Sequence, residues 1–203
     1  NGDKITEVCN VSTEELAQHN YSWNHNEYLL DEDMAKLMEK SSCEWKTLAE
    51  MCEIKNGKQL DKKNMIKGIY KVYGGGKNIV GYHNQSNREE DHIVIAATGN
   101  YSGFVNYEQS RFWASQCFTI KTCNNLILNN KYLYFLLKTI YESKFMKKQQ
   151  GGSQSYIRIH SFNKMKIPIP SIETQKEIVE QLDDLTEQIS GLKNRKEGID
   201  RQM

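Results

Sequence analysis

The middle of the chain consists of short stretches rich in β-branched and aromatic residues, separated by clusters of glycine. One stretch covers residues 69–82 and contains three consecutive glycines, and a second covers 92–107 and contains Gly99 and Gly103. This pattern is typical of strands joined through tight turns. The chain is therefore predicted to have a sheet at its centre. Polar side chains on the turns would be held out from it, where recognition residues are commonly found.

Two later stretches have the spacing of helices. Between Lys131 and Lys148 the apolar residues fit an amphipathic helix; they are Leu133, Leu136, Leu137, Ile140, Tyr141 and Phe145. From Glu173 on, a 4-3 spacing typical of a coiled-coil seam is formed by Ile178, Leu182, Leu185, Ile189, Leu192 and Ile199. Gly191 and Gly198 each weaken this helix by roughly 1 kcal/mol relative to Ala. We therefore expect it to need a partner helix, as a spacer or dimer arm; packing on its own domain is the alternative.

The remaining segments connect these elements. Residues 44–58 predict a short helix and then a strand that ends at a glycine turn. A polar loop is expected at 84–91 and a further strand at 111–120. The pair Gly151-Gly152 is expected to break the preceding helix and lead into a short strand. After it, the sequence Ile167-Pro168-Ile169-Pro170 predicts an extended exit toward the last helix.

Charge is distributed unevenly although the net charge is only +1. Residues 1–43 hold 3 Lys/Arg against 9 Asp/Glu, whereas residues 131–166 hold 8 Lys/Arg against 1 Asp/Glu. The acidic segment is too short to bury a core of its own, so we interpret it as a connector. The predicted organisation is thus a connector at 1–43, a domain at 44–172 and a C-terminal helix at 173–203. The basic block indicates a polyanionic partner.

Composition restricts the class of protein. A hydrophobic content of 38% and 10% aromatic residues can support a core. No apolar run approaches the roughly 18 residues that a membrane span needs. The five cysteines contain no Cys-x-x-Cys pair, which favours reduced thiols in a cytoplasmic protein over a zinc site. Because the chain begins with Asn1 and not Met, we expect it to be a piece of a longer protein.

Motifs for catalysis are weak. The segment Gly74–Lys77 is not a phosphate-binding loop, since the Walker spacing would need Gly in place of Lys71 and Ser or Thr in place of Asn78. Asp33 with Glu44-Trp45-Lys46 only faintly imitates the acidic-x-lysine arrangement of metal-dependent nucleases. The 2 prolines are not adjacent, so the Asn/Asp-Pro-Pro-aromatic motif of adenine methyl transfer is missing. We expect no catalytic residue, no metal site and no cofactor in this chain.

An ordered series of motifs carries a family resemblance. They are Tyr73-Gly74-Gly75-Gly76, Ile79-Val80-Gly81-Tyr82, Ile93-Val94-Ile95, Gly99, Gly103, Phe112-Trp113-Ala114, Tyr132–Leu137, Gly152-Ser153-Gln154, Lys166–Pro170 and Gln175–Val179. Together they resemble a target-recognition domain of a type I restriction-modification DNA specificity subunit, over about 44–190. In addition, residues 10–28 are similar to the tail of an N6-adenine DNA methyltransferase subunit, which implies a fused modification-specificity polypeptide.

The resemblance implies an α/β fold, with a twisted mixed-sheet target-recognition domain followed by a long coiled-coil-type helix. It implies recognition of a specific sequence in double-stranded DNA, which is delivered to an N6-adenine methyltransferase domain or subunit. S-adenosylmethionine would be held by that partner. Two features depart from the family. Ser155 stands where Pro is frequent, and one recognition domain is present where two are usual, which implies half of a site or a homodimer through the C-terminal helix.

The candidate DNA-binding residues follow from this resemblance and from their chemistry. Amides suit adenine, cations suit guanine and phosphate, and a threonine methyl suits thymine. The candidates for base contacts are Lys77, Asn78, Thr98, Asn100, Tyr101, Ser102, Gln154, Ser155 and Tyr156, and those for phosphate contacts are Lys147, Lys148 and Arg158. Solvated lysines on a helix face are the alternative interpretation of the basic block. For the whole chain, the alternatives are a protein-docking module without sequence-specific DNA binding and an enzyme in its own right.

Overall fold

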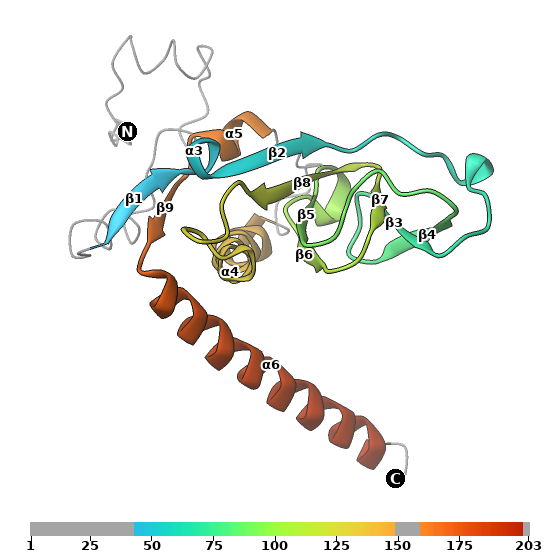
Figure 1. The fold of residues 1–203 in the computed structure, drawn as a ribbon. Coiled ribbons are helices and arrows are strands. Elements are labelled where there is room, and N and C mark those ends of the chain that lie inside the picture. The colour runs from blue at the N-terminus through green and yellow to red at the C-terminus, as the bar shows by residue number, and fades with distance from the viewer. Residues whose placement is uncertain (1–42, 149–158, 201–203) are drawn as a thin grey trace, which may run out of the picture. The chain divides into compact units, whose positions relative to one another are not determined.

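Figure 1 shows the computed structural model of the chain, which describes residues 43–148 and 159–200. The acidic connector predicted at 1–43, apart from Cys43, and the break at Gly151-Gly152 lie outside these residues. The chain divides into two compact units, Asn1–Trp45 and Lys46–Met203. Nearly all of the described elements belong to the second unit.

The elements alternate between strands and short helices before two long helices complete the chain. In order they are β1 (Glu44–Thr47), α3 (Leu48–Met51), β2 (Cys52–Asn56), η2 (Lys62–Asn64), β3 (Tyr70–Tyr73), β4 (Ile79–His83), β5 (His92–Ala96), η3 (Gly99–Tyr101), β6 (Val105–Glu108), β7 (Phe112–Ala114), β8 (Cys117–Thr122), α4 (Asn130–Lys148), α5 (Ile159–Asn163), β9 (Lys166–Ile169) and α6 (Ile172–Asp200).

The strands form two main sheets. One is antiparallel, with the strand order β2-β8-β5-β6. The other has the order β4-β3-β7, in which β3 runs antiparallel to β4 and parallel to β7. β1 and β9 form a separate pair. The predicted α/β fold with a mixed sheet is confirmed, and the two glycine-marked hairpins are β3–β4 and β5–β6.

Strand β5 is an inner strand of the four-stranded sheet and is buried along its whole length. Ile93 and Ile95 belong to the larger core, which also contains residues of α3, α4, α5, β8 and β9. Val94 belongs to a smaller core shared with Tyr73 and Phe112 of the second sheet. Because side chains alternate along a strand, β5 contributes to both cores. It thereby holds the two sheets together.

The prediction of a single strand at 111–120 is wrong. The chain forms β7 and β8 there, which belong to different sheets. Between them Ser115 donates its N–H to Tyr73 O at 2.9 Å, and its hydroxyl accepts the N–H of Leu60 at 2.9 Å. The sequence looked continuous because both strands are buried throughout, apart from one residue of β8. The polar pair Ser115-Gln116 lies at the crossing, but two polar residues between apolar ones also fit the alternation within a single strand.

Helix α5 was also not predicted. It precedes β9, where only an extended segment was expected after the glycine pair. Phe162 of α5 is fully buried and packs edge-on against Phe118 of β8, with the ring centroids 4.8 Å apart. A five-residue helix is too short to leave a periodic pattern in the sequence, and packing in the core stabilises it.

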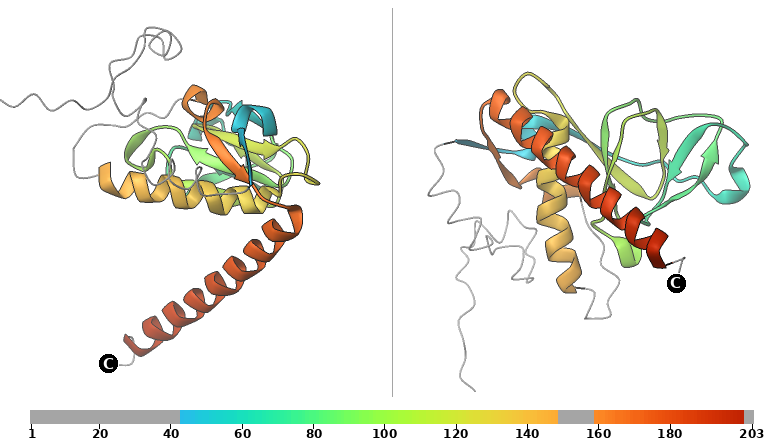
Figure 2. Two further views of the ribbon diagram at one scale, coloured as in Figure 1. Left: turned by 90° about the vertical axis from the view of Figure 1, so that its left-hand side faces the viewer. Right: turned by 90° about the horizontal axis from the view of Figure 1, so that it is seen from below.

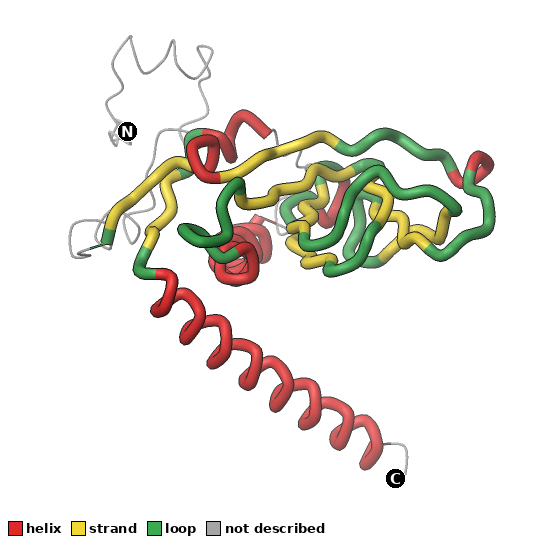
Figure 3. The backbone as a smooth tube through the Cα atoms, viewed as in Figure 1, coloured by secondary structure: helices red, strands yellow, loops and turns green. Residues whose placement is uncertain are grey.

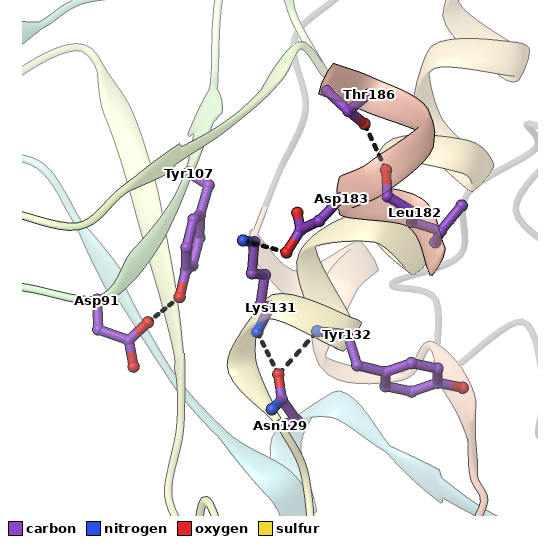
Figure 4. Close-up of polar contacts among 8 residues, drawn as sticks. All are labelled: Asp91, Tyr107, Asn129, Lys131, Tyr132, Leu182, Asp183 and Thr186. Carbon is purple, nitrogen blue, oxygen red and sulfur yellow. Dashed lines mark hydrogen bonds and ion pairs between the residues drawn. The ribbon is translucent and has the colours of Figure 1, made fainter. Parts of the chain in front are cut away.

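The predicted helix at 131–148 is confirmed as α4. Asn129 caps its start by accepting the N–H groups of Lys131 and Tyr132, at 2.9 and 3.0 Å (Figure 4). Asparagine is a favoured residue at this position because it satisfies N–H groups that have no partner within the helix. Leu133 and Leu137 are fully buried in the larger core. The helix therefore covers the face of the four-stranded sheet that bears Ile93.

The predicted C-terminal helix is confirmed as α6, and its start is fixed to the domain. Gln175 is fully buried, donates its amide to Ile127 O and Pro170 O at 2.9 Å each, and accepts the N–H of Asn129 at 2.8 Å. Two turns further on, Asp183 pairs with Lys131 of α4 at 2.6 Å (Figure 4). The rest of α6 extends away from the sheets (Figure 1). Among the described residues, no helix is both long and apolar enough to cross a membrane.

Candidate nucleic-acid interface

The turn between β3 and β4 lies against the loop between β5 and β6. A Cβ atom on Gly75 would lie only 2.8 Å from Thr98 Oγ1, so the backbones approach closely. Asn106 donates its side-chain amide to Lys77 O at 3.4 Å. Lys77 Nζ lies 5.1 Å from the ring centre of Tyr101. The two glycine-marked hairpins therefore form one continuous surface, which we call the tip surface and which consists of Lys77, Asn78, Thr98, Asn100 and Tyr101.

Glycines shape the loop on the β5–β6 side. Gly99 and Gly103 have φ angles of +81° and +93°, which strongly favour glycine. Between them η3 makes a single tight turn, and Gly103 donates its N–H to Ala96 O at 2.8 Å. This geometry returns the chain directly into β6. The loop is thus a defined structure anchored at both ends.

The described candidates differ in how accessible they are. Lys77, Asn78 and Asn100 are exposed, Tyr101 is 40% exposed and Thr98 is half-buried. Ser102 is fully buried, and its hydroxyl donates to Ala97 O at 3.3 Å. The expectation that Ser102 contacts a base is therefore corrected. Its short side chain fits inside the loop and satisfies a carbonyl there.

Lys77 occupies a particular electrostatic position. Its ammonium lies over the ring of Tyr101 and also 5.4 Å from the ring centre of Phe104. A cation over an aromatic face is attracted by the ring quadrupole, which restricts the flexible side chain. The β3–β4 turn thereby presents a positive charge over the ring of Tyr101 on the neighbouring loop.

A buried carboxylate fixes the sheets beneath the tip surface. Glu108 of β6 accepts hydrogen bonds from Lys71 Nζ and Tyr73 Oη of β3, at 2.9 Å each, and from the Ser110 hydroxyl at 2.7 Å. Burial alone would raise the pKa of Glu108, but these hydrogen bonds outweigh it and lower that pKa. Burial and the bond to Glu108 raise the pKa of Tyr73. The network connects β6 with β3. β3 leads into the β3–β4 turn, and β6 follows the β5–β6 loop, so the network lies beneath both parts of the tip surface.

The polar loop predicted at 84–91 is confirmed as a loop, but its role was missed. Asn87 pairs with Ala114 of β7 through both groups of its amide, at 2.7 and 2.9 Å. Arg88 donates to Thr119 of β8 at 2.8 Å and to Asn56 O at the end of β2 at 2.6 Å. Burial lowers the pKa of Arg88. These side chains connect the two sheets, and nothing in the local sequence distinguished them from a solvated loop.

The basic candidates at the end of α4 are only partly described. Lys147 and Lys148 lie in its last turn, and Gln154, Ser155, Tyr156 and Arg158 lie outside the described residues. The direction of α4 is clear. Asn130 at its start donates to Asp91 O, next to the start of β5, at 2.8 Å. The helix then runs along β5 and β6 toward the loop that holds η3, and both views of Figure 2 show its C-terminal end on the same side as that loop.

Stacking and hydrogen bonding hold α4 on this course. The rings of Tyr134 in α4 and Tyr107 in β6 stack with centroids 5.3 Å apart. Tyr107 donates its hydroxyl to Asp91 (Figure 4). Burial, together with this bond, raises the pKa of Tyr107. The axis of α4 is therefore fixed relative to the hairpin that carries the η3 loop.

The tip surface offers a cation, two amides, two hydroxyls and an aromatic ring. In the part of the chain that the structure describes, no group of three or more His, Cys, Asp or Glu residues is placed to hold a metal ion. Burial raises the pKa of the Cys52 and Cys117 thiols to about 12, so both are neutral thiols at pH 7.

Comparison with known proteins identifies relatives of the whole described region. A family model described as the type I restriction modification DNA specificity domain matches residues 41–201. A protein of Haemophilus influenzae named as a type I restriction enzyme specificity subunit is 30% identical over 159 residues, which are 75% of this chain and 40% of that protein. The EcoprrI specificity subunit of Escherichia coli is 24% identical over 153 residues, which are 71% of this chain and 37% of that protein.

Solved structures show the same fold. The S subunit of a type I restriction-modification system from M. genitalium matches with a TM-score of 0.62 and 24% identity, over 82% of this chain and 47% of that one. The HsdS subunit from Thermoanaerobacter tengcongensis matches with a TM-score of 0.58 and 17% identity, over 89% of this chain and 50% of that one. The chain thus spans about half the length of these proteins or less. Because the family model covers residues 41–201 of the 203, this chain belongs to the family of type I restriction-modification DNA specificity domains.

Proposed function

We propose that this chain recognises a short, specific sequence in double-stranded DNA through the tip surface. The observation that supports this most directly is the junction of the two hairpins, where Gly75 meets Thr98 and Lys77 lies over Tyr101. A recognition site needs several directional groups at fixed relative positions. One hairpin alone would supply too few of them.

Each exposed group of the tip surface has a suitable partner on DNA. The amides of Asn78 and Asn100 can pair with the N6 and N7 edge of adenine, and Lys77 can donate to O6 and N7 of guanine. The Thr98 methyl group suits the thymine methyl. The half-exposed ring of Tyr101 offers an apolar contact as well as a hydroxyl.

Phosphate contacts would come from the basic block that ends α4 and follows it. Lys147, Lys148 and Arg158 would neutralise phosphates without regard to sequence, which increases affinity and makes it salt-dependent. The direction of α4 toward the η3 loop supports this assignment. Base contacts and backbone contacts would then lie on one side of the domain.

The chain would act as the recognition part of a larger methyltransferase system. Its relatives are named as specificity subunits of type I restriction enzymes. One similar solved structure is titled for complex assembly of a type I restriction-modification system. We infer that an N6-adenine methyltransferase domain or subunit binds this chain, holds S-adenosylmethionine and flips the target adenine out of the duplex. This chain would supply the sequence specificity and no catalytic group.

Helix α6 would serve as an arm for association. Its early apolar residues Ile178 and Val179 pack against the domain core. Leu185, Ile189 and Leu192 are 51%, 52% and 62% exposed, at the 4-3 spacing of a coiled-coil seam. An exposed seam of this kind is stabilised by a partner helix. A homodimer through α6 would supply the second half of a bipartite DNA site.

Selection of bound duplexes from a random library, followed by sequencing, tests the main proposal. We expect one enriched short sequence. Asn100→Ala or Lys77→Ala should relax the preference at individual positions, at a cost of about 1–3 kcal/mol of discrimination each. The double variant Lys147→Ala with Lys148→Ala should weaken binding to all sequences alike and reduce the salt dependence.

Two outcomes would contradict the proposal. Equal losses on enriched and scrambled duplexes from the tip variants would remove the assignment of base contacts. If the chain fails to shift random duplex in a gel at low salt, DNA binding itself is excluded, and a protein-docking role replaces it. An enzymatic role would require that the isolated chain turn over DNA.

A further inference from the structure

The connection between β2 and β3 is a second basic segment, apart from the block near α4. It covers residues 57–68, and Figure 3 shows it as a long loop interrupted by the short helix η2. It contains four lysines and a single acidic residue, Asp61. We call it the lysine loop. Its lysines, all of them exposed, are Lys58, Lys62, Lys63 and Lys67.

The first half of the lysine loop is tied to the second sheet. Lys58 donates its N–H to Ala114 O at 2.9 Å, and the Trp113 indole donates to Lys58 O at 2.8 Å. The N–H of Leu60 donates to the Ser115 hydroxyl at 2.9 Å. A connector of this length has no need of such bonds to span between two strands. They hold its backbone in one conformation.

The second half is fixed to β4. Ile66 donates its N–H to Nδ1 of the buried His83 at 3.0 Å, and that ring packs edge-on against Trp113 with centroids 5.1 Å apart. A Cβ atom on Gly68 would lie 2.2 Å from His83 O, so the backbone follows β4 closely. Because both halves are held, η2 presents Lys62 and Lys63 from a rigid support. Ordering the backbone on binding would cost little further entropy.

Among the described residues, the lysines of the lysine loop form no ion pair. Asp61 accepts a hydrogen bond from Gln59 at 3.0 Å. As far as the described residues go, none of the four lysines has a carboxylate within 4.0 Å to form an ion pair, whereas Lys71 and Lys131 each do. Adjacent lysines without a counterion repel one another, and a polyanion relieves that repulsion.

The distance along β4 between the lysine loop and the tip surface indicates which part of a bound duplex the lysine loop would contact. β4 begins next to Asn78 of the tip surface and ends at His83, which binds the lysine loop. A strand of five residues spans about 15 Å. At 3.4 Å per base pair, this is about four to five base pairs. The lysine loop would therefore meet DNA beside the bases that the tip surface contacts.

We propose that the lysine loop binds phosphates of the duplex that flanks the recognised sequence. This inference rests on the proposed DNA recognition by the tip surface and extends its footprint to one side. Lys62 and Lys63 are the principal contacts, because η2 places them at the outer end of the domain, beyond β4 (Figure 1). The contact is independent of sequence, since lysines on phosphate carry no base information.

A protein partner is the competing occupant. Ile66 and Ile69 are 59% and 80% exposed in or next to the lysine loop, and exposed apolar residues also suit a protein interface. The observations favour DNA because the four lysines have no carboxylate partner within 43–148 and 159–200, and because their support is rigid. Phosphates are the ligand that matches both features.

The test compares two duplexes that carry the sequence enriched by selection. The short duplex ends at the recognised bases, and the long duplex has ten further base pairs on each side. The variant Lys62→Gln with Lys63→Gln is compared with Lys176→Gln plus Lys193→Gln, which removes two exposed charges from α6. Binding of the full chain is measured at 50 and 200 mM salt.

We expect the lysine-loop variant to bind the long duplex more weakly and the short duplex as wild type does. Two lost phosphate contacts reduce the salt slope by about 1.8, so the defect should be about ten-fold larger at 50 mM than at 200 mM. The α6 variant should match wild type on both duplexes. Unchanged binding to the long duplex, or equal losses on both duplexes, would overturn the proposal.

Two further results separate the competing explanations. Loss of binding to a methyltransferase partner with DNA affinity intact would assign the lysine loop to a protein and overturn its assignment to DNA. If wild type does not discriminate between enriched and scrambled duplexes, the proposed recognition function fails by itself. Thermal unfolding of the variant should be unchanged, because both side chains are exposed.

Discussion

At the scale of single residues, the tip surface depends on how closely two backbones can approach. Gly75 lies where a side chain would meet Thr98 at 2.8 Å, whereas a Cβ atom on the neighbouring Gly76 would have nothing within 4 Å. The three consecutive glycines therefore differ in role although they are identical in the sequence. Only Gly75 is required for the close approach of the two hairpin tips.

Substitution at these two positions tests this difference. Gly75→Ala should push the β3–β4 turn away from the β5–β6 loop, because backbone and side chain of Thr98 both lie within 3.0 Å of the added carbon. We expect a loss of about 1–3 kcal/mol in stability, together with weaker and less selective DNA binding. Gly76→Ala is the matched control and should stay within about 0.5 kcal/mol of wild type. Identical behaviour of the two variants in denaturant titrations would contradict the assigned contact.

At the scale of elements, polar side chains that are buried or half-buried position the strands that carry the tips. Glu108 joins β6 to β3, and Arg88 joins the 84–91 loop to β8 and β2. Both are charged side chains whose burial is tolerated because each has several hydrogen-bond partners. A purely apolar contact between the sheets would allow them to slide. Directional bonds fix the register of one sheet against the other.

Removing the charge of Glu108 tests this role and its pH dependence. Glu108→Gln should cost about 1–3 kcal/mol at pH 7, because charge-assisted hydrogen bonds from Lys71, Tyr73 and Ser110 are weakened. The pKa of Glu108 is lowered in the folded state, so its stabilisation is complete above the ordinary carboxyl value of 4.5 and is lost as the pH falls through the folded pKa. The difference in stability between wild type and Glu108→Gln should therefore narrow below about pH 4.5.

A matched control for Glu108 is available on the surface. Glu89 pairs with Arg111 at 2.9 Å, with side chains 66% and 50% exposed. Glu89→Gln should change the free energy of unfolding by less than about 1 kcal/mol at any pH, since exposed pairs contribute little. Unfolding in urea at pH 7, 5 and 3.5 compares the three proteins. A constant gap between wild type and Glu108→Gln over this range would refute the role of its carboxylate.

At the scale of the whole molecule, the domain can fold around its own cores, whereas the exposed part of α6 needs a partner helix to cover its apolar residues. The second unit completes its own cores around β5, and the first turns of α6 contribute Ile178 and Val179 to them. Beyond the Lys131–Asp183 pair, Leu185, Ile189 and Leu192 of α6 are exposed and do not pack against the cores of the described domain. Folding of the domain and association through the arm should therefore be separable by mutation.

Charged substitutions in the seam test the association of α6. Leu185→Glu with Ile189→Glu places two charges where a partner helix would pack, and should leave the chain monomeric while wild type self-associates. The control Ser190→Glu with Asn194→Glu adds the same charge at exposed positions outside the seam. Sedimentation velocity over a range of concentrations distinguishes these states. Wild type that stays monomeric at all concentrations would exclude the homodimer.

The sequence by itself determined those features that repeat locally. The spacing of apolar residues identified α4 and α6, because a helix buries one face at regular intervals. β-Branched residues beside glycines identified both hairpins, because such residues favour strands and glycine clusters mark tight turns. Positive φ angles require glycine only in the β5–β6 loop, at Gly99 and Gly103. The motifs also sufficed to identify the family, because they occur along the chain in the same order as the helices and strands of the fold.

Only the tertiary structure decided which residues meet. It separated β7 from β8, placed Ser102 inside a loop and brought Lys77 onto the ring of Tyr101. It also assigned Asn87 and Arg88 to the junction of the sheets and fixed the lysine loop to β4 and β7. These contacts join residues up to 55 positions apart. Local propensity and periodicity report on neighbours within one or two turns of chain, so such pairings emerge only when the sheets pack.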